Sequence, residues 1–286
     1  MIQVGDLRLH LINDCRILVD AGGAFGLVPR ALWRDLLPPD AENRVPMTHH
    51  NLLVQTKDRN ILIDTGYGTK IPEKQRGYMF MERNAGGLMA GLARVALTPT
   101  DIHLVINTHL HADHCGGNTF IDADNQLQAT FPNAEYVVQA REYHDATHAN
   151  ERTRATYLVE NFAVLKETGR LRLLDGDTDF GSGIRGVVTP GHTPGHMSII
   201  LENGGQSVMF VCDLASYAIH FERLGWMTGY DVEPLVTLET KRIYQSWALD
   251  NQALLIFPHD SVRPVGRYVE KEDGKRTVIA VPEPYV

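Results

Sequence analysis

Four side chains that can bind metal ions lie close together after an apolar segment. They follow Leu104-Val105-Ile106 and are His109, His111, Asp113 and His114. Side chains 109 and 111 point the same way if the chain stays extended, and a turn can aim the other two at a neighbouring point. Burying clustered ionisable groups is costly without a partner, which favours metal binding over a structural role. The segment therefore predicts a metal site, and it can serve two metal ions.

Three later segments offer further ligands, each directly after an apolar strand. His192 follows the predicted strand 184–188, Asp213 follows 207–211, and His259 follows 254–257. Prolines and glycines around His192 predict a rigid turn, so this side chain loses little further entropy on binding a metal ion. Loops that a rigid sheet positions commonly carry active groups. We therefore expect all four segments to meet at one site.

Short strands alternate with helical stretches along the chain. Leu7, Leu9 and Leu11 alternate with polar residues and predict a half-buried strand. Residues 51–56 and 60–64 flank a polar turn and predict a hairpin, and further strands are predicted at 104–106, 136–138, 184–188, 198–201, 207–211 and 254–257. Two sheets packed face to face with helices outside would fit this order, although periodicity alone does not separate that fold from other mixed folds.

Three helices are predicted, over residues 88–96, 152–166 and 234–250. The second places four apolar side chains roughly on one face: Tyr157, Leu158, Phe162 and Leu165. The third begins at Pro234, which suits a first helical turn, and places Val236, Ile243 and Trp247 on one stripe. We expect these faces to pack against the sheets.

Composition limits the classes of partner. The chain has 286 residues, 43% of them hydrophobic, and a formal net charge of -8 without a local run of Lys or Arg, which argues against nucleic acid. No apolar run approaches the roughly eighteen residues of a membrane span. Three cysteines, Cys15, Cys115 and Cys212, are too few and scattered for a disulfide framework and fit a reducing compartment. Without a visible secretory signal, we expect a cytoplasmic protein.

The ligand segments carry a family resemblance. The order His-X-His-X-Asp-His, Pro-Gly-His-Thr-Pro-Gly-His, a strand-terminal Asp and a late His resembles metallo-β-lactamase-fold hydrolases from about residue 50 to residue 260. Within that fold the chain looks most like the branch of N-acyl-homoserine lactone lactonases and methyl parathion hydrolase, with weaker matches at 26–29, 62–66 and 238–241. The resemblance implies one α+β domain over 1–286, a four-layer αβ/βα sandwich of two mixed sheets face to face with helices outside.

The resemblance also implies a ligand set. One metal ion would lie on His109, His111 and His192, the other on Asp113, His114 and His259, with Asp213 bridging them. His196 would then have a supporting role, and Asp64 would either orient the ligand loop or form a turn. Cys212 should point away from the metals, because neighbouring strand residues face opposite sides. Such nitrogen and oxygen ligands suit Zn and would also accept Mn, Fe or Co.

A catalytic scheme follows from the same resemblance. Two divalent ions that share a solvent molecule lower its pKa from about 15.7 towards about 7, so no Ser or Cys nucleophile is needed. Asp113 would shuttle a proton to the leaving group, and either Tyr217 or His220 would stabilise the oxyanion. Five residues are candidates for an apolar substrate pocket, although each also fits an ordinary core: Phe25, Trp33, Met47, Phe80 and Trp226.

The preferred function is hydrolysis of a lactone or another small ester-like substrate. Phosphotriester or phosphodiester hydrolysis on the same ions is one alternative, and an iron-dependent persulfide dioxygenase on the same fold is another. A metal-binding module without catalysis is a third. The expected partner is a small molecule. The sequence leaves the oligomeric state open between a monomer and a homodimer, and relatives of this branch are often dimers.

Overall fold

The computed structural model describes residues 1–282, and its strands form two seven-stranded sheets and a separate pair. The first sheet has the order β1 (Ile2–Val4), β2 (Leu7–Asp20), β3 (Arg44–Gln55), β4 (Asn60–Ile63), β5 (Leu104–Ile106), β8 (Glu135–Gln139) and β9 (Leu171–Leu174). The second has the order β10 (Thr178–Gly181), β11 (Ile184–Val188), β12 (Met197–Asn203), β13 (Gln206–Phe210), β14 (Leu254–Ile256), β15 (Val265–Glu270) and β16 (Arg276–Ala280). The pair is β6 (Thr119–Ile121) and β7 (Leu127–Ala129).

Both sheets are mixed, because helical crossovers join their parallel strands. In the first sheet β4, β5, β8 and β9 are parallel neighbours, and in the second β13 and β14 are. The crossovers contain α4 (Gly87–Arg94), α6 (Ala140–Thr147), α7 (Ala163–Glu167), α8 (Ala218–Glu222) and α9 (Pro234–Asp250). Short helices complete the chain: α1 (Ala21–Phe25), α2 (Arg30–Trp33), α3 (Glu73–Tyr78) and α5 (Ala112–Cys115). The predicted hairpin over 51–64 is present as β3 and β4.

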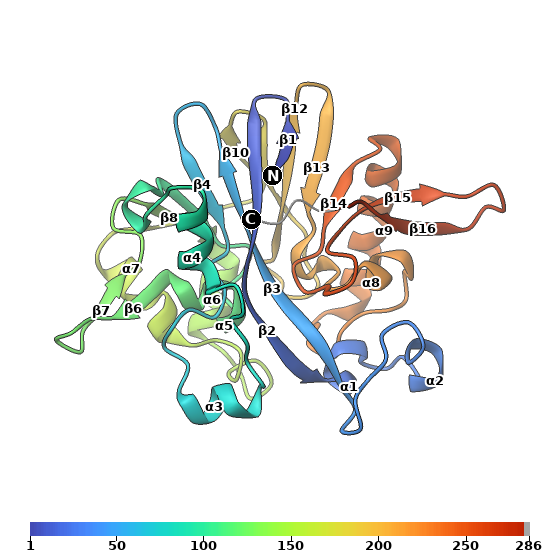
Figure 1. Ribbon diagram of the computed structural model, residues 1–286, viewed down its shortest axis with the longest axis horizontal. Helices are drawn as coiled ribbons and strands as arrows, with labels where there is room; N and C mark the ends of the chain where they lie inside the picture. The colour runs from blue at the N-terminus through green and yellow to red at the C-terminus, as the bar shows by residue number, and fades with distance from the viewer. Residues whose placement is uncertain (283–286) are drawn as a thin grey trace.

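The two sheets share an apolar core between them. Strand register places Leu11, Leu52, Ile63, Ile106 and Val137 in one row across the first sheet, and all five are buried in this core. A matching row crosses the second sheet: Ile199, Phe210, Ile256 and Val265. The outer face of each sheet packs against helices, α4, α6 and α7 on one side and α8 and α9 on the other (Figure 1). This is the predicted four-layer αβ/βα sandwich.

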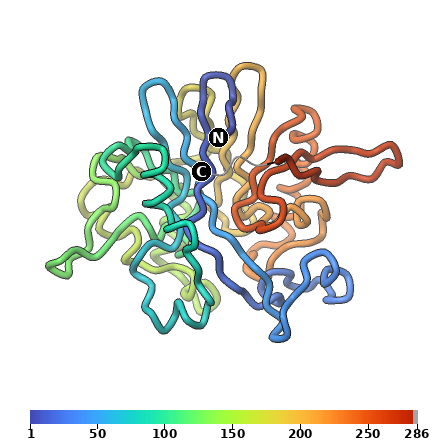
Figure 2. Tube along the Cα trace, in the orientation of Figure 1, coloured from blue at the N-terminus to red at the C-terminus, as the bar shows by residue number. Residues whose placement is uncertain are grey.

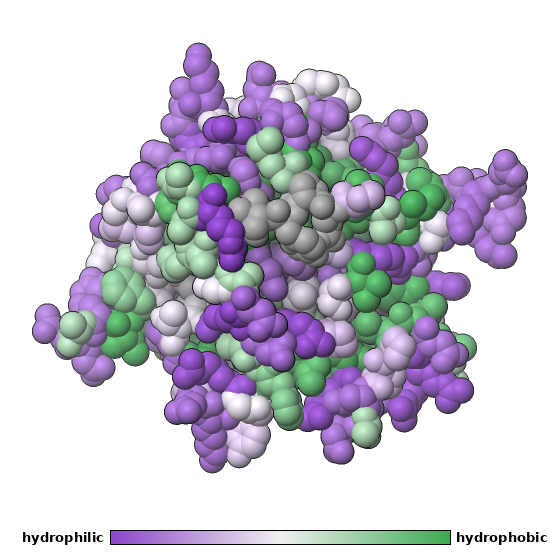
Figure 3. Space-filling model, in the orientation of Figure 1, coloured by the Kyte–Doolittle hydropathy of each residue, from purple (hydrophilic) through white to green (hydrophobic). Residues whose placement is uncertain are grey.

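The middle and the C-terminal part of the chain lie on opposite sides of the molecule, and α1 and α2 lie on the side of the C-terminal part. Figure 2 shows the green middle of the chain on one side and the orange-to-red part on the other. Strand β1 of the first sheet also contacts β12 and β13 of the second, which joins the sheets at one edge. Hydrophilic residues cover much of the face in Figure 3, including the projecting turn between β15 and β16. Among the described residues, no helix is both long and apolar enough to cross a membrane.

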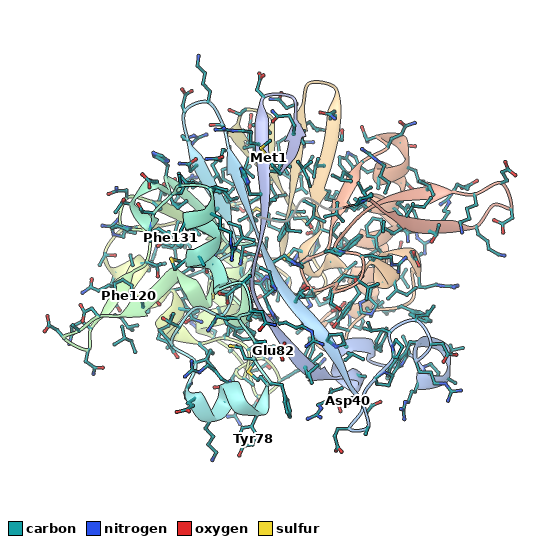
Figure 4. The ribbon with its side chains drawn as sticks, viewed as in Figure 1. Met1, Asp40, Tyr78, Glu82, Phe120 and Phe131 are labelled. Carbon is teal, nitrogen blue, oxygen red and sulfur yellow. The ribbon has the colours of Figure 1, made fainter. Side chains whose placement is uncertain are left out.

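A loop after α3 packs back onto the long strand β2. Figure 4 shows Glu82 next to this strand, and Glu82 pairs with Arg16 at 3.3 Å. The backbone N–H of Arg16 also donates to the carbonyl of Glu82 at 2.9 Å. Tyr78 at the end of α3 points into solvent and is 72% exposed. The segment between β4 and α4 is therefore attached to the sheet through backbone and charged contacts, and Tyr67, Met79 and Met81 add apolar contacts.

The prediction of a helix over residues 152–166 is wrong for most of that segment. Residues 151–156 form turns, a short 3-10 helix follows at Val159–Asn161, and only α7 matches. A long-range contact occupies a backbone group that a helix would use, because the Thr156 carbonyl accepts from the N–H of Ala112. The Arg152 side chain donates to the carbonyls of Gly229 and Asp231, which connects this turn to that loop. The apolar side chains Tyr157, Phe162 and Leu165, which were predicted to share one helix face, are nevertheless buried.

Helix α9 has the predicted bounds but buries a different face. The predicted stripe is largely exposed, with Ile243 at 64% and Val236 at 39%. The buried face carries Thr237, Thr240, Lys241, Gln245 and Ala248. The Lys241 ammonium donates to the carbonyls of His220 and Trp226 at 3.0 and 2.5 Å, and Gln245 donates to the carbonyl of Phe221. These hydrogen bonds hold the segment after Asp213 and offset the cost of burying polar groups.

Replacing Lys241 with Met should therefore destabilise the fold. The change leaves buried carbonyls without donors, which costs about 1–3 kcal/mol. Urea unfolding would measure the loss, with Ile243→Ala on the exposed face of the same helix as a control near zero. Equal stability of Lys241→Met and the unsubstituted protein would show that these bonds do not hold the segment.

Candidate metal centre

The structure brings all seven predicted ligand side chains together at one edge of the two sheets. His109 and His111 lie in the loop after β5, and α5 carries Asp113 and His114. The remaining three follow strands of the second sheet: His192 after β11, Asp213 in a 3-10 turn (Cys212–Leu214) after β13, and His259 after β14. Six of the seven are buried, and the Asp113 side chain is 20% exposed.

The first group of ligand atoms comes from three histidines. His109, His111 and His192 each offer a ring nitrogen, and the three nitrogens lie within 4.8 Å of one another. His192 Nε2 lies 3.1 Å from His111 Nδ1 and 3.2 Å from Asp213 Oδ2. His109 Nε2 lies 3.9 Å from the same carboxylate oxygen. The geometry can accommodate one cation among these nitrogens.

The second group lies on the other side of Asp213. His259 Nε2 is 3.0 Å from Asp213 Oδ1 and 3.0 Å from His114 Nε2. Asp113 Oδ2 is 3.6 Å from His114 Nε2 and 3.7 Å from His259 Nε2. Asp213 Oδ1 thus faces His259, whereas Oδ2 faces His192 and also lies 3.5 Å from His114 Nε2, so the carboxylate lies between the two groups.

The chemistry of these side chains fits divalent metal ions. His109 Nε2 is buried and has no hydrogen-bond partner among the described residues, which a bound cation would supply. Burial and neighbouring imidazoles hold the pKa of His109 well below its usual value, and burial lowers the pKa of His111 to about 3. Both rings are then neutral and can donate a lone pair. Burial alone would raise the pKa of Asp213, but His259 and His192 lower it well below normal.

Hydrogen bonds on the outer side of the rings fix their orientation. His114 Nδ1 lies 2.9 Å from Asp64 Oδ2, His192 Nδ1 3.0 Å from Asp231 Oδ1, and His259 Nδ1 2.8 Å from the Thr48 carbonyl. Each partner accepts a hydrogen and leaves Nε2 to face the centre. Asp64 also accepts from Thr108 N–H and has a φ of 57°, so it combines both expected roles. No motif in the sequence points to Asp231.

Two other side chains support the ligand segments. His196 Nε2 accepts the backbone N–H of Asp213 at 3.1 Å, which is the supporting role expected for it. The buried Glu142 accepts from Leu110 N–H at 3.0 Å and from the Thr193 hydroxyl at 2.6 Å, and so connects the loop after β5 to the turn around His192. Sequence reasoning missed Glu142, because nothing in its helical context distinguishes it from a surface carboxylate.

The cysteines lie outside the centre. Cys212 begins a 3-10 turn with φ 52°, so strand alternation does not govern its direction. Its sulfur lies 3.1 Å from the Thr108 hydroxyl and 3.6 Å from His114 Nδ1, the nitrogen that faces away from Asp213. Cys115 donates to the Leu110 carbonyl at 3.2 Å, which fits a packing role.

A cavity of about 160 Å³ opens onto the ligand side chains. Tyr217 and His220 do not line it: Tyr217 stacks on Phe25 at 6.1 Å, and His220 meets Phe25 edge-on at 5.3 Å. Of the five candidate pocket residues, only Met47 lines the cavity. Sequence reasoning missed two tyrosines in its wall. The lining residues are Val19, Met47, Tyr67, His111, Asp113, Thr156, His192, Asp213, Ser216, Tyr230 and His259.

The sequence profile of the Metallo-beta-lactamase superfamily matches residues 44–235, and the chain therefore belongs to this superfamily. An N-acyl homoserine lactonase from Bacillus sp is 29% identical over 221 residues, which cover 73% of this chain and 79% of the relative. Another from Bacillus cereus is 28% identical over 234 residues, 78% of this chain and 82% of the relative. The predicted family is confirmed, and family and donor set together support a metal-dependent hydrolase that takes divalent metal.

Solved structures agree on the fold. A probable metal-dependent hydrolase from Staphylococcus aureus superposes with a TM-score of 0.88 at 29% identity, over 100% of both chains. AidC, described as a dizinc quorum-quenching lactonase in complex with a product, has a TM-score of 0.81 at 22% identity and covers 99% of this chain and 97% of its own. At that identity the likeness to AidC shows the fold alone.

Asp64→Asn should weaken metal binding. The amide cannot accept from Thr108 N–H and the His114 ring as the carboxylate does, so the His114 ring loses its fixed orientation. Loss of such a partner typically lowers metal affinity about 10–100-fold. Titration with Zn²⁺ against a chelating dye would measure the change, with the exposed Asp58→Asn as the control. Unchanged affinity in Asp64→Asn would remove the orienting role of Asp64.

Proposed function

We propose that this protein is a dinuclear metal-dependent hydrolase of a lactone or another small ester-like substrate. The position of Asp213 carries the proposal, because its carboxylate lies between two groups of ligand atoms, with Oδ2 3.2 Å from His192 and Oδ1 3.0 Å from His259. We assign one ion to His109, His111 and His192, the other to Asp113, His114 and His259, and the bridge to Asp213. Zn suits this donor set best, and Mn, Fe or Co would also fit.

The protein's own side chains have distinct tasks in this proposal. Two bound cations would activate water and polarise the substrate's carbonyl oxygen. Asp113 is the ligand carboxylate most open to the cavity, and we assign it to hold the proton that passes to the leaving group. Tyr67 takes the oxyanion role considered for Tyr217 and His220. It lines the cavity, and burial raises its pKa well above normal, so it stays a donor.

The surroundings of the cavity favour a substrate with an apolar arm. A groove of about 700 Å³ has mostly apolar walls, including the exposed Leu27, Leu32 and Leu235. A smaller cavity shares Arg152 and Gly229 with this groove and His111, Thr156 and Tyr230 with the metal cavity. The two charged side chains at the groove already have partners within the protein, since Arg152 donates to backbone carbonyls and Asp231 pairs with His192. An acyl chain would fit this groove better than a charged group.

Zinc-loaded protein should hydrolyse acyl-homoserine lactones, as the names of its relatives suggest. Base consumption in a pH-stat would follow butanoyl- and decanoyl-homoserine lactone and paraoxon, and we expect kcat/KM to be highest for the decanoyl compound. Each buried methylene is worth about 0.8 kcal/mol, or about fourfold. His109→Ala and Asp213→Ala should abolish turnover.

Other outcomes would point elsewhere. Faster turnover of paraoxon would favour phosphotriester hydrolysis on the same site. If the protein contained iron and consumed oxygen when a persulfide was added as the substrate, as an oxygen electrode would measure, the dioxygenase would be favoured. If both alanine variants kept full hydrolysis, the proposed centre would not be the catalytic one.

Tyr67→Phe should lower kcat without lowering metal content. Loss of one donor to a developing oxyanion typically costs at least about 100-fold in kcat. Steady-state kinetics with metal analysis would test this, with Tyr78→Phe as the control because that side chain is 72% exposed. An unchanged kcat would exclude Tyr67 as the donor.

A further inference from the structure

His49 lies beside the centre and belongs to neither ligand group above. It sits on β3 and is 1% exposed, and its Nε2 makes no well-aligned hydrogen bond among residues 1–282, although a carboxylate oxygen of Asp113 lies 3.4 Å away. A buried imidazole nitrogen without a partner is costly. Among the seven proposed ligands His109 Nε2 shares this property, and there the proposed metal ion supplies the missing partner.

The unpartnered nitrogen faces the second group of ligand atoms. His49 Nε2 lies 3.4 Å from Asp113 Oδ2, the oxygen that also faces His114 and His259. Ligand atoms of His49, Asp113 and His259 lie within 4.8 Å of one another. Atoms bound to one ion at about 2.0–2.2 Å cannot lie further apart than roughly 4.4 Å, so small adjustments suffice for all three to share an ion.

The other side of the ring permits the required tautomer. His49 Nδ1 lies 3.6 Å from the sulfur of Cys15, which is buried. A thiol sulfur is a weak acceptor, so Nδ1 can carry the hydrogen and point it at Cys15, which leaves the Nε2 lone pair free. The rings of His49 and His259 meet edge to face, with centroids 4.9 Å apart, and do not block each other.

We propose that His49 is an additional ligand of the metal ion held by Asp113, His114 and His259. This inference rests on the proposed dinuclear centre. With bridging Asp213, the second ion has five protein ligands, whereas the first has four: His109, His111, His192 and Asp213. Four nitrogen and oxygen ligands suit Zn, and a larger set suits metals of higher coordination number such as Mn, Fe or Co. The two positions therefore differ in metal preference.

Cobalt binding tests the assignment without relying on activity. The full chain, freed of metal, would be titrated with Co²⁺ against a chelating dye, and its visible absorption recorded, since Co²⁺ absorbs more strongly as its coordination number falls. The unsubstituted protein should bind two ions. In His49→Asn the side chain is too short to reach the ion, so this variant should bind one of the two ions more weakly by over about 100-fold. That loss exceeds the effect of removing a partner that only supports a ligand. The visible absorption of its bound Co²⁺ should also be stronger.

Two further variants make the outcome decisive. His10→Gln removes another buried histidine, one that bonds Gln55 on the neighbouring strand, and should change neither property. His49→Gln can still donate to Asp113 but is a poor ligand, so it should resemble His49→Asn. If His49→Gln kept the original affinity and spectrum, His49 would act through a hydrogen bond and the ligand assignment would be wrong.

The remaining results separate this inference from the proposed function. Unchanged binding of two ions by His49→Asn would overturn the ligand assignment alone. Binding of fewer than two ions by the unsubstituted protein would overturn the dinuclear centre, and the assignment with it. Urea unfolding of each metal-free variant would confirm that the compared proteins are folded.

Discussion

A buried carboxylate between two groups of imidazoles is the interaction on which this structure depends. Asp213 is 6% exposed and lies within 3.0–3.2 Å of His259 and His192 on opposite oxygens. Groups of this kind are costly to remove from water unless a cation or hydrogen bonds satisfy them. The proposed pair of metal ions would supply that compensation and make the cluster stable in the folded protein.

Both sheets contribute to holding the cluster in place. Asp64, directly after β4 of the first sheet, orients His114, whereas Asp213 and His259 follow neighbouring parallel strands of the second sheet. Glu142 connects the two ligand turns, and Lys241 ties the segment after Asp213 to α9. Because each of these groups is buried and hydrogen-bonded, together they restrict the positions of the ligand side chains. Such rigidity lowers the entropy cost of binding.

Local patterns in the sequence were sufficient to predict the ligand segments and the strands that precede them, but they did not predict β1, β6, β7, β9, β10, β15 or β16. Apolar runs such as 104–106 and 254–256 became buried strands, and the side chains after them met as expected. Features that depend on distant contacts could not be predicted in this way. The segment 152–156 forms turns in which the Thr156 carbonyl accepts from the distant Ala112, and α9 buries Lys241 because carbonyls of a separate segment surround it.

The site shows the same division. Asp231, Tyr67 and His49 carry no motif, and they reach the centre only because the fold brings β3 and two loops to it. Tyr217 and His220 are close to Asp213 in sequence, but α8 directs them into the apolar packing around Phe25. Proximity to Asp213 along the chain therefore did not identify the side chains that line the cavity. The spacing of the motif residues did identify the side chains that meet around Asp213.

The central claim is that this cluster holds two metal ions bridged by Asp213. Anomalous X-ray diffraction from crystals of the metal-loaded protein, collected on both sides of the metal absorption edge, tests it most directly. The account predicts two separate anomalous peaks, one beside His109, His111 and His192 and one beside Asp113, His114 and His259, with the Asp213 carboxylate between them. A single peak, or two peaks without Asp213 between them, would contradict it.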